Sequence, residues 1–178
     1  MANADTAFRI GTGYDVHAFA PPGARRALVL GGVTIPHDRG LAGHSDADVL
    51  IHALVDALLG AAALGDIGGH FPSSDDRWRD APSAAFLTYT ADLLRARGWR
   101  IENVDATLVA EQPRLSPHVP AMRARLAELL GLPVERVSVK SKTTDGLGFT
   151  GRGEGMACHA VALIARLPLS PRRERTGG

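Results

Sequence analysis

The stretch GHSDADVLIHALVDALLGAAALGDIG, residues 43–68, contains the clearest helical signal in the chain. Its segment Ser45 to Asp48 fits a capping box, in which the serine accepts a hydrogen bond from the third helical amide and an acidic residue occupies that third position. An apolar stretch follows and runs to Leu64. The pattern predicts a helix that is capped by Ser45 and extends to Leu64.

Two further helices are predicted downstream of this one. The first covers Ser83 to Arg97 and ends at Gly98. The second covers Pro117 to Leu130, with Ser116 as its cap, a proline at the first helical position and Gly131 at its end.

Stretches rich in β-branched residues predict five strands, at residues 9–14, 28–35, 101–109, 137–142 and 156–167. The pair Gly31-Gly32 interrupts the second strand and indicates a bulge or a close backbone approach. Strands and helices are intermixed without strict alternation. This order favours an α+β two-layer sandwich, with helices on one face of a mixed sheet, over a doubly wound parallel sheet.

Composition indicates one globular domain, since 45% of the 178 residues are hydrophobic and 22% are charged. We expect this domain over residues 9–167, with flexible tails at 1–8 and 168–178. The net charge of +1 gives no field that would attract nucleic acid or an anionic membrane. Residues 1–8 do not show the positive charge and apolar core typical of a secretory leader, and nowhere do about eighteen apolar residues run together. The lone Cys158 predicts a buried thiol. These features predict a cytoplasmic protein with no nucleic-acid or membrane partner.

Two sets of side chains could bind a metal ion. Asp15 and His17 are two residues apart after a strand, so they point the same way, and His52 could join them from the predicted helix. These three would leave a fourth tetrahedral position open, as catalytic zinc requires. The rival set is Asp48, His52 and Asp56, which share one helical face. Spacing alone does not decide between these two ligand sets. It also allows an interpretation without a metal ion, in which Asp15 is a turn residue, His52 is a packed histidine and Asp48 is a capping carboxylate.

Phosphate binding is suggested at two places. His44 stands before the predicted helix start, where backbone amides and the helix dipole favour a phosphate, although a loop histidine without a role fits equally. The segment KSKTTDGLGFTGRGEG, residues 140–155, combines two lysines, an arginine, three threonines and five glycines. It lacks the ending of a Walker loop, and Gly11-Thr12-Gly13 lacks the third glycine of a dinucleotide fingerprint. Glycine-rich turns without a ligand are the alternative.

Five motifs together resemble the 2-C-methyl-D-erythritol 2,4-cyclodiphosphate synthase family in their order and spacing. They are GTGYDVHAF at 11–19, LGGVTIP at 30–36, the stretch at 43–68, HFPSSD at 70–75 and TTDGLGFTGRGEG at 143–155. The resemblance spans roughly residues 9–167.

The resemblance implies a metal-dependent enzyme. Asp15, His17 and His52 would be zinc ligands, and a second divalent ion, Mg²⁺ or Mn²⁺, would bridge the substrate diphosphate near Asp145. The family more commonly has glutamate at that position. Because aspartate is one methylene shorter, contact at Asp145 could pass through a water molecule.

The implied substrate is 4-diphosphocytidyl-2-C-methyl-D-erythritol 2-phosphate, whose 2-phosphate attacks the phosphate nearer the sugar and expels CMP. The implied product is a cyclic diphosphate of non-mevalonate isoprenoid biosynthesis. His44 and Thr143 would stabilise the transition state, and Ser45 would bind phosphate beside His44. The resemblance further implies a homotrimer whose sites lie between subunits.

The remaining implied substrate contacts form two groups. On the metal and erythritol side they are Asp15, Val16, His17, Asp66, Ile67, Gly68, Phe71, Pro72, Ser73, Ser74 and Asp75. On the cytidine side, supplied by a neighbouring subunit, they are Ala110, Glu111, Gln112, Pro113, Arg114, Leu115, Ser116, Lys142, Thr143, Thr144, Asp145, Phe149 and Arg152.

Two other functions compete with this reading. A zinc phosphohydrolase would need a base beside the metal, but no His-Glu-x-x-His helix occurs, and Glu111 and Glu154 have no evident link to the ligands. A zinc-stabilised trimeric protein that binds nucleotides or isoprenoid diphosphates would close its metal site with a fourth protein ligand. The sequence offers no clear candidate for that ligand.

Overall fold

The computed structural model describes residues 8–167 as one α+β domain. The expected tails lie outside this range, except for Phe8, which is the first residue of a strand. Within the range, no helix is long and apolar enough to cross a membrane.

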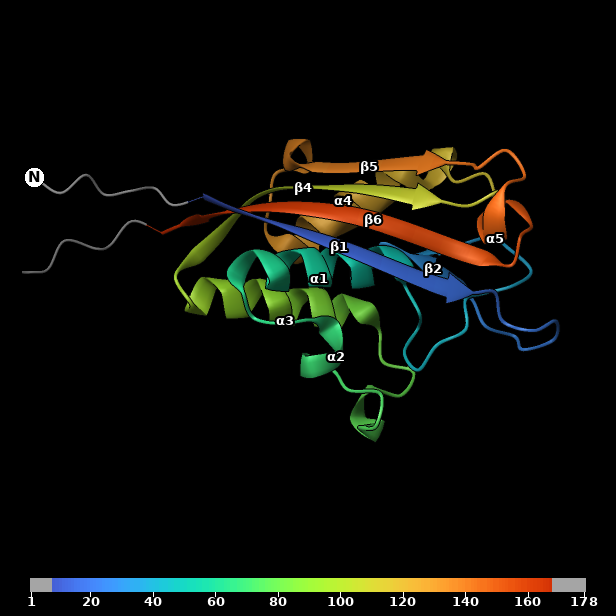
Figure 1. The fold of residues 1–178 in the computed structure, drawn as a ribbon, viewed down its shortest axis with the longest axis horizontal. Coiled ribbons are helices and arrows are strands. Elements are labelled where there is room, and N and C mark those ends of the chain that lie inside the picture. Colours follow the sequence, from blue (N-terminus) through green and yellow to red (C-terminus); the bar gives the residue numbers. More distant parts are fainter. Residues whose placement is uncertain (1–7, 168–178) are drawn as a thin grey trace, which may run out of the picture.

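The main sheet has four strands in the order β1-β6-β4-β5. They are β1 (Phe8–Ala18), β6 (Gly155–Arg166), β4 (Trp99–Val109) and β5 (Val137–Lys142). The β4–β5 pair is parallel, whereas β1–β6 and β4–β6 are antiparallel. The expected mixed sheet is therefore confirmed, and β1 and β5 form its two edges (Figure 1).

The expected single strand over residues 28–35 is wrong, because this segment folds back on itself. It forms a separate two-stranded sheet of β2 (Leu28–Leu30) and β3 (Val33–Ile35). Gly31 and Gly32 connect the strands with φ values of 61° and 72°. A two-residue hairpin turn with both φ values positive needs residues without a Cβ. The glycine pair thus forms a tight turn, where we expected a bulge or a close backbone approach.

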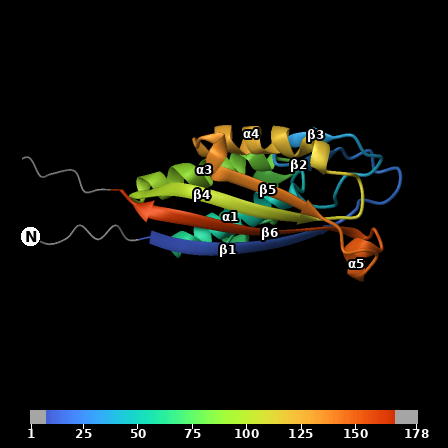
Figure 2. The same ribbon diagram turned by 90° about the horizontal axis from the view of Figure 1, so that it is seen from above.

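Three long helices cover one face of the main sheet (Figure 2). They are α1 (Val49–Ala62), α3 (Ser83–Ala96) and α4 (Val119–Leu130). The short helical elements are α2 (Ile67–His70), α5 (Gly148–Gly151), and the 3₁₀ turns η1 (Asp76–Trp78), η2 (Ser116–His118) and η3 (Val134–Arg136). This arrangement confirms the expected two-layer α+β sandwich.

Helix α1 begins later than its sequence pattern predicts, and the capping box at Ser45 is wrong. Ala47 has a φ of 58°, in the left-handed region, so the chain cannot be helical there. The Ser45 hydroxyl accepts instead from the Ala47 N–H at 3.1 Å. Asp48 is the actual cap and accepts from the amides of Leu50 and Ile51.

The two other helices follow their predictions closely, except at the start of α4. Helix α3 begins at Ser83 and finishes within one residue of the expected end. Helix α4 finishes at Leu130, with Gly131 at φ 67° behind it, as expected. Ser116 does not cap α4, because it starts η2 and the helix begins only at Val119.

Helix α1 packs directly on the backbone of β1. A Cβ on Gly11 would stand 2.0 Å from the Ala57 carbonyl oxygen, and one on Gly13 would stand 1.9 Å from that of Ala53. Every residue of α1 except Asp56 and Gly60 is buried, which makes it the central helix of the core. Because side chains alternate along a strand, Asp15 follows Gly11 and Gly13 on the face toward α1.

Candidate active site

Three potential metal ligands meet where β1 faces α1. Asp15 Oδ2 lies 3.0 Å from His17 Nε2 and 3.1 Å from His52 Nδ1, and the two histidine nitrogens are 3.1 Å apart. Ligand atoms at the usual 2.0–2.1 Å from a tetrahedral zinc ion lie about 3.3 Å from one another. The three side chains are therefore spaced like ligands around one divalent cation, although Asp15 and His17 lie within β1 and not after a strand.

A hydrogen bond on the far side of His17 determines which nitrogen faces this point. His17 Nδ1 lies 2.7 Å from the carbonyl oxygen of Ala42. A carbonyl oxygen can only accept, so Nδ1 carries the proton and Nε2 presents its lone pair to Asp15 and His52. Such an outer partner is the usual support of a metal-binding histidine.

The charge pattern of the triad suits a cation. Burial alone would raise the pKa of Asp15, but hydrogen bonds and charge attraction from His17 and His52 hold that pKa well below its usual range. Burial would lower the pKa of His17, whereas its hydrogen bond to Asp15 raises it above the ordinary value. Asp15 is therefore a carboxylate at neutral pH, and its surroundings favour positive charge.

The rival ligand set on the helix is wrong, because both of its carboxylates bind backbone amides. Asp48 accepts from Gly31 N–H at 2.9 Å and from Gly32 N–H at 2.7 Å, besides capping α1. Asp56 accepts from the Ile67 N–H at 2.7 Å. Within residues 8–167, the three side chains that converge for a metal are those of the β1 pair and His52.

The segment before α1 lies beside the triad. Ser45 Oγ is 3.2 Å from His52 Nε2, on the side of the ring away from Asp15. His44 Nε2 is buried and has no hydrogen-bond partner in the part of the chain that the structure describes. Val16, by contrast, alternates to the opposite face of the sheet from Asp15 and His17, where 39% of its surface is exposed.

The turn at Asp66 is connected to the helix that carries His52. Asp66 caps α2 and accepts from Gly69 N–H at 2.8 Å. The bond from the Ile67 N–H to Asp56 joins this turn to α1, one helical turn beyond His52. The segment Ile67-Gly68 is thereby held near the triad by α1 itself.

The next predicted contacts divide into buried and exposed residues. Phe71 is a core residue, with its ring centroid 4.4 Å from that of Phe86 and 5.2 Å from that of Trp78. Asp75 caps η1 and binds the Arg77 guanidinium at 2.6 Å. Phe71 therefore acts through packing, whereas Pro72, Ser73 and Ser74 form the loop between these two fixed points.

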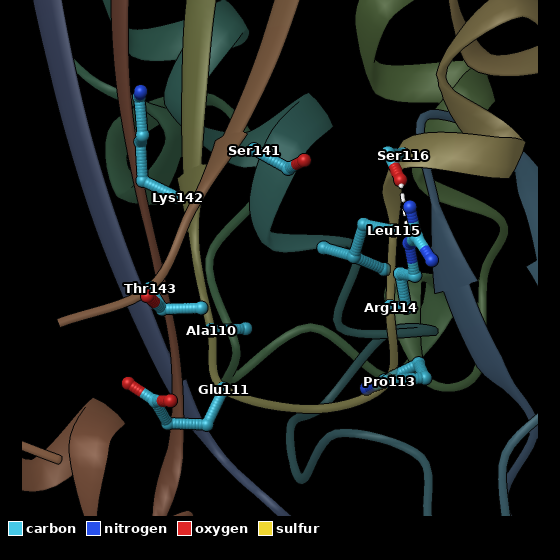
Figure 3. A pocket seen from close by; sticks show the side chains of 9 residues that line it. All are labelled: Ala110, Glu111, Pro113, Arg114, Leu115, Ser116, Ser141, Lys142 and Thr143. Atoms are coloured by element: carbon cyan, nitrogen blue, oxygen red, sulfur yellow. Dashed lines mark hydrogen bonds between the residues drawn. The ribbon is translucent and has the colours of Figure 1, made fainter. Parts of the chain in front are cut away.

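A pocket of about 150 Å³ lies at the ends of β4 and β5 (Figure 3). Its lining consists of Ala110, Glu111, Pro113, Arg114, Leu115, Ser116, Ser141, Lys142 and Thr143. Eight of these nine belong to the expected cytidine contacts, and Ser141 was missed. The pocket lining does not include Gln112, Thr144, Asp145, Phe149 or Arg152.

Glu111 shapes this pocket by holding the loop that follows β5. Its Oε1 accepts from Thr144 N–H at 2.9 Å and from Gly146 N–H at 3.3 Å. These backbone bonds lower the pKa of the Glu111 carboxyl. Glu154 is likewise engaged, by Arg152 at 2.7 Å. Both carboxylates have structural partners away from the triad, which disfavours a phosphohydrolase that would use either as its base.

The C-terminal end of β1, which carries Asp15 and His17, and the C-terminal ends of β4 and β5, beside the pocket, lie at the same end of the sheet, and β1 and β5 are its opposite edges (Figure 1). Strands β6 and β4 separate β1 from β5, and at about 4.8 Å per strand spacing the two edges are about 14 Å apart. None of the three candidate metal ligands lines the pocket.

Comparison with known proteins identifies relatives over nearly the whole chain. The YgbB family model matches residues 8–165. The 2-C-methyl-D-erythritol 2,4-cyclodiphosphate synthase of Moorella thermoacetica is 60% identical over 156 residues, covering 88% of this chain and 94% of the relative. The protein of the same name from Xanthomonas oryzae is 56% identical over 160 residues, covering 90% and 96%.

A solved structure from the same comparison supports the family match and the two relatives. A structure titled as a CDP complex of IspF from Plasmodium falciparum is 32% identical, has a TM-score of 0.79, and covers 92% of this chain and 99% of its own. The fold, the convergent triad and these similarities agree with one another. The chain therefore belongs to the YgbB family, whose curated relatives are 2-C-methyl-D-erythritol 2,4-cyclodiphosphate synthases.

Proposed function

We propose that this protein converts 4-diphosphocytidyl-2-C-methyl-D-erythritol 2-phosphate to 2-C-methyl-D-erythritol 2,4-cyclodiphosphate and CMP, in non-mevalonate isoprenoid biosynthesis. The observation that carries the proposal is the convergence of Asp15, His17 and His52 in a chain 60% identical to a synthase of this name. The substrate contains its own nucleophile, the 2-phosphate. The protein has to bring together two phosphates that repel each other, which is a task of positioning and charge stabilisation.

Asp15, His17 and His52 would hold Zn²⁺ through one carboxylate oxygen and two imidazole nitrogens. When bound, zinc would supply Lewis-acid polarisation of the attacked phosphate. Three protein ligands leave a position for a substrate oxygen, whereas a structural zinc site is closed by a fourth protein ligand. Within residues 8–167 three side chains converge and no fourth joins them, which favours catalysis over the alternative of a zinc-stabilised trimeric binding protein.

Asp145 would lie near the second divalent ion, Mg²⁺ or Mn²⁺. Its side chain is exposed, and its Oδ1 accepts from the Thr143 hydroxyl at 3.1 Å. A carboxylate suits a hard cation that keeps part of its water shell, so the short aspartate can bind through one of those waters.

His44, Ser45 and Thr143 would contact the reacting phosphates. The buried Nε2 of His44 has no partner among residues 8–167, so it is available to a phosphate oxygen. The exposed hydroxyl of Thr143 donates its one proton to Asp145, and it would turn from that carboxylate to donate to a phosphate oxygen. Preorganised donors at the developing negative charge lower the barrier without reorganisation during the reaction.

The erythritol and cytidine ends would bind to different parts of the chain. The turn at Asp66, Ile67 and Gly68, with the loop at 71–75, would position the erythritol hydroxyls next to the triad. The pocket at Ala110 to Ser116, with Lys142 to Asp145, would bind cytidine, and Phe149 and Arg152 would complete that side. The relative from Plasmodium falciparum, described as a CDP complex, supports a nucleotide ligand for this fold.

The active form would be a homotrimer whose sites lie between subunits. The sheet face opposite the helices exposes apolar side chains, with Ile10 69%, Tyr14 51% and Val161 43% exposed. A contiguous apolar face of this kind is typical of an interface. Association through it would also let the pocket of one subunit meet the triad of another. The buried, unpaired Cys158 suits a reducing compartment, so we propose that the enzyme works in the cytoplasm.

The deciding experiment is incubation of the metal-loaded protein with 4-diphosphocytidyl-2-C-methyl-D-erythritol 2-phosphate, followed by phosphorus NMR with and without a chelator. Cyclic diphosphate and CMP that appear only with metal would establish the reaction. Release of inorganic phosphate would indicate a phosphohydrolase. Unchanged substrate that nevertheless binds to assembled, metal-replete protein would favour the binding protein.

A further inference from the structure

A buried serine from a different helix lies behind the metal-binding histidine of α1. Ser83, the first residue of α3, has no exposed surface, and its Oγ is 2.9 Å from His52 Nε2. On its other side, the Ser83 hydroxyl donates to Asp46 Oδ1, and the Ser83 N–H donates to Asp46 Oδ2 at 3.0 Å. Asp46, Ser83 and His52 form a chain of hydrogen bonds that leads from a half-buried carboxylate through a buried hydroxyl to the metal-binding ring.

The direction of each bond in this chain follows from proton counting. A carboxylate accepts only, so the single hydroxyl proton of Ser83 points to Asp46. The oxygen of Ser83 must then accept from His52, which places the imidazole proton on Nε2. With a metal ion bound, the lone pair of His52 Nδ1 is then free for the ion, and this is the atom that lies 3.1 Å from Asp15 Oδ2. Without an ion, an additional proton on Nδ1 can donate to that carboxylate.

The nearby Ser45 does not reverse this assignment. Its Oγ is 3.2 Å from His52 Nε2 and already accepts from the Ala47 N–H at 3.1 Å. A proton donated from Ser45 to Nε2 would leave that nitrogen's lone pair facing the Ser83 oxygen at 2.9 Å, which is repulsive. The shorter contact with Ser83 therefore controls the ring.

We propose that Asp46 and Ser83 are positioning residues for the metal centre, which hold His52 in the Nε2–H tautomer so that Nδ1 points at the metal. Without Asp46, the Ser83 hydroxyl is free to donate to Nε2, and the imidazole proton then moves to Nδ1, between Asp15 and His17. A proton at that point competes with the metal ion. The inference rests on the metal site of the proposed function and is independent of the reaction.

Metal affinity tests the proposal directly, in the full-length protein. We expect Ser83→Ala and Asp46→Asn each to weaken Zn²⁺ binding about 10- to 100-fold in competition with a chromophoric chelator, as for other outer partners of metal-binding histidines. The visible spectrum of the Co²⁺-loaded variants should change as well, because the ring that ligates the ion is no longer fixed. Ser83→Thr keeps the hydroxyl and should restore most of the affinity.

The matched control is Thr90, a second buried hydroxyl of α3. It donates to the Phe86 carbonyl oxygen at 2.8 Å and makes no hydrogen bond to His52. Thr90→Val removes a buried hydroxyl from the same helix at nearly constant volume, and it should leave zinc affinity and the Co²⁺ spectrum unchanged. A loss as large as that of Ser83→Ala would show a general effect of α3 packing and overturn the proposal.

Imidazole nitrogen NMR of the metal-free wild type supplies a readout that needs neither metal nor substrate. We expect a proton on His52 Nε2 at pH 8, and partial loss of that proton in Asp46→Asn. A wild-type His52 Nε2 without a proton, or unchanged zinc affinity in a folded Ser83→Ala protein, would overturn the inference and leave the proposed function intact. A wild type that carries the proton on Nε2 but binds no zinc would instead contradict the proposed function.

Discussion

Gly13 of β1 lies so close to Ala53 of α1 that a Cβ atom on the glycine would stand 1.9 Å from the Ala53 carbonyl oxygen. This contact sets the distance between the strand that carries Asp15 and His17 and the helix that carries His52. Metal-site geometry is thus controlled by a backbone contact that contains no metal ligand.

Gly13→Ala should therefore destabilise the fold and the metal site together. The added methyl group has to push β1 away from α1, and overpacking of this kind typically costs about 1–3 kcal/mol. We expect a lower urea midpoint and weaker Zn²⁺ binding. Gly60→Ala on α1 is the control, because its Cβ would meet only Thr12 O at 3.8 Å and should stabilise the helix by up to about 1 kcal/mol. Equal stability of the two variants would contradict the packing argument.

Asp48 should make stability depend on pH. Burial raises the pKa of this carboxyl to about 6, from 3.8 in the unfolded chain, and its four backbone donors only partly offset that effect. Because the folded state holds the proton more tightly, its contribution to stability is complete below pH 4 and is lost as pH rises through 6. At about 1.4 kcal/mol per pKa unit, the loss is roughly 3 kcal/mol.

Urea unfolding of the metal-free protein between pH 4 and pH 7 measures this effect. Asp48→Asn cannot titrate, so the difference in unfolding free energy between the wild type and this variant should shrink as pH rises. A difference that is constant or grows across this range would show that the carboxyl is already ionised in the folded protein.

His52→Ala should lose Zn²⁺ and activity together, because two ligands remain of three. Thr143→Ala should keep the fold and the zinc content but slow turnover about 100- to 1000-fold, as expected for loss of one preorganised donor. Zinc content by elemental analysis, beside single-turnover rates, separates the two effects. A zinc-free His52→Ala protein with full activity would exclude the proposed mechanism.

Ile10→Asp should break the proposed trimer without unfolding the subunit. The Ile10 side chain is already exposed in the single chain, so a charge is tolerated there but not within an apolar interface. Light scattering after gel filtration should report a monomer with unchanged circular dichroism. Val134→Asp, at an exposed site on the 3₁₀ turn η3, should remain trimeric. A wild-type protein that is monomeric at assay concentration would contradict the assembly itself.

Local patterns predicted most elements of the fold. Strand β5 has its expected bounds, and α3 and α4 end within one residue of the positions indicated by Gly98 and Gly131. The prediction of the start of α1 fails because a single backbone angle determines where this helix begins. The left-handed φ of Ala47 moves the start of α1 past the apparent capping box, and nothing about an alanine signals that conformation.

The candidate site was only partly accessible from sequence. Residue spacing predicted that Asp15 and His17 point the same way. It did not show whether His52 forms a ligand set with these two residues or with Asp48 and Asp56. That choice depends on the close packing of β1 on α1 and on the backbone amides that occupy Asp48 and Asp56. Ser83 and Asp46 gave no signal at all, because the hydrogen bonds between them join segments 37 residues apart.

The position of β1 at the edge of the sheet has a consequence for biosynthesis. Within residues 8–167, β1 pairs in this sheet with β6 alone, and β6 is the last strand to leave the ribosome. Asp15 and His17 therefore emerge early but gain a fixed backbone only when residues 155–166 have been translated. A chain released before residue 155 would lack the strand that fixes Asp15 and His17, so metal retention can serve as a readout of β1–β6 pairing.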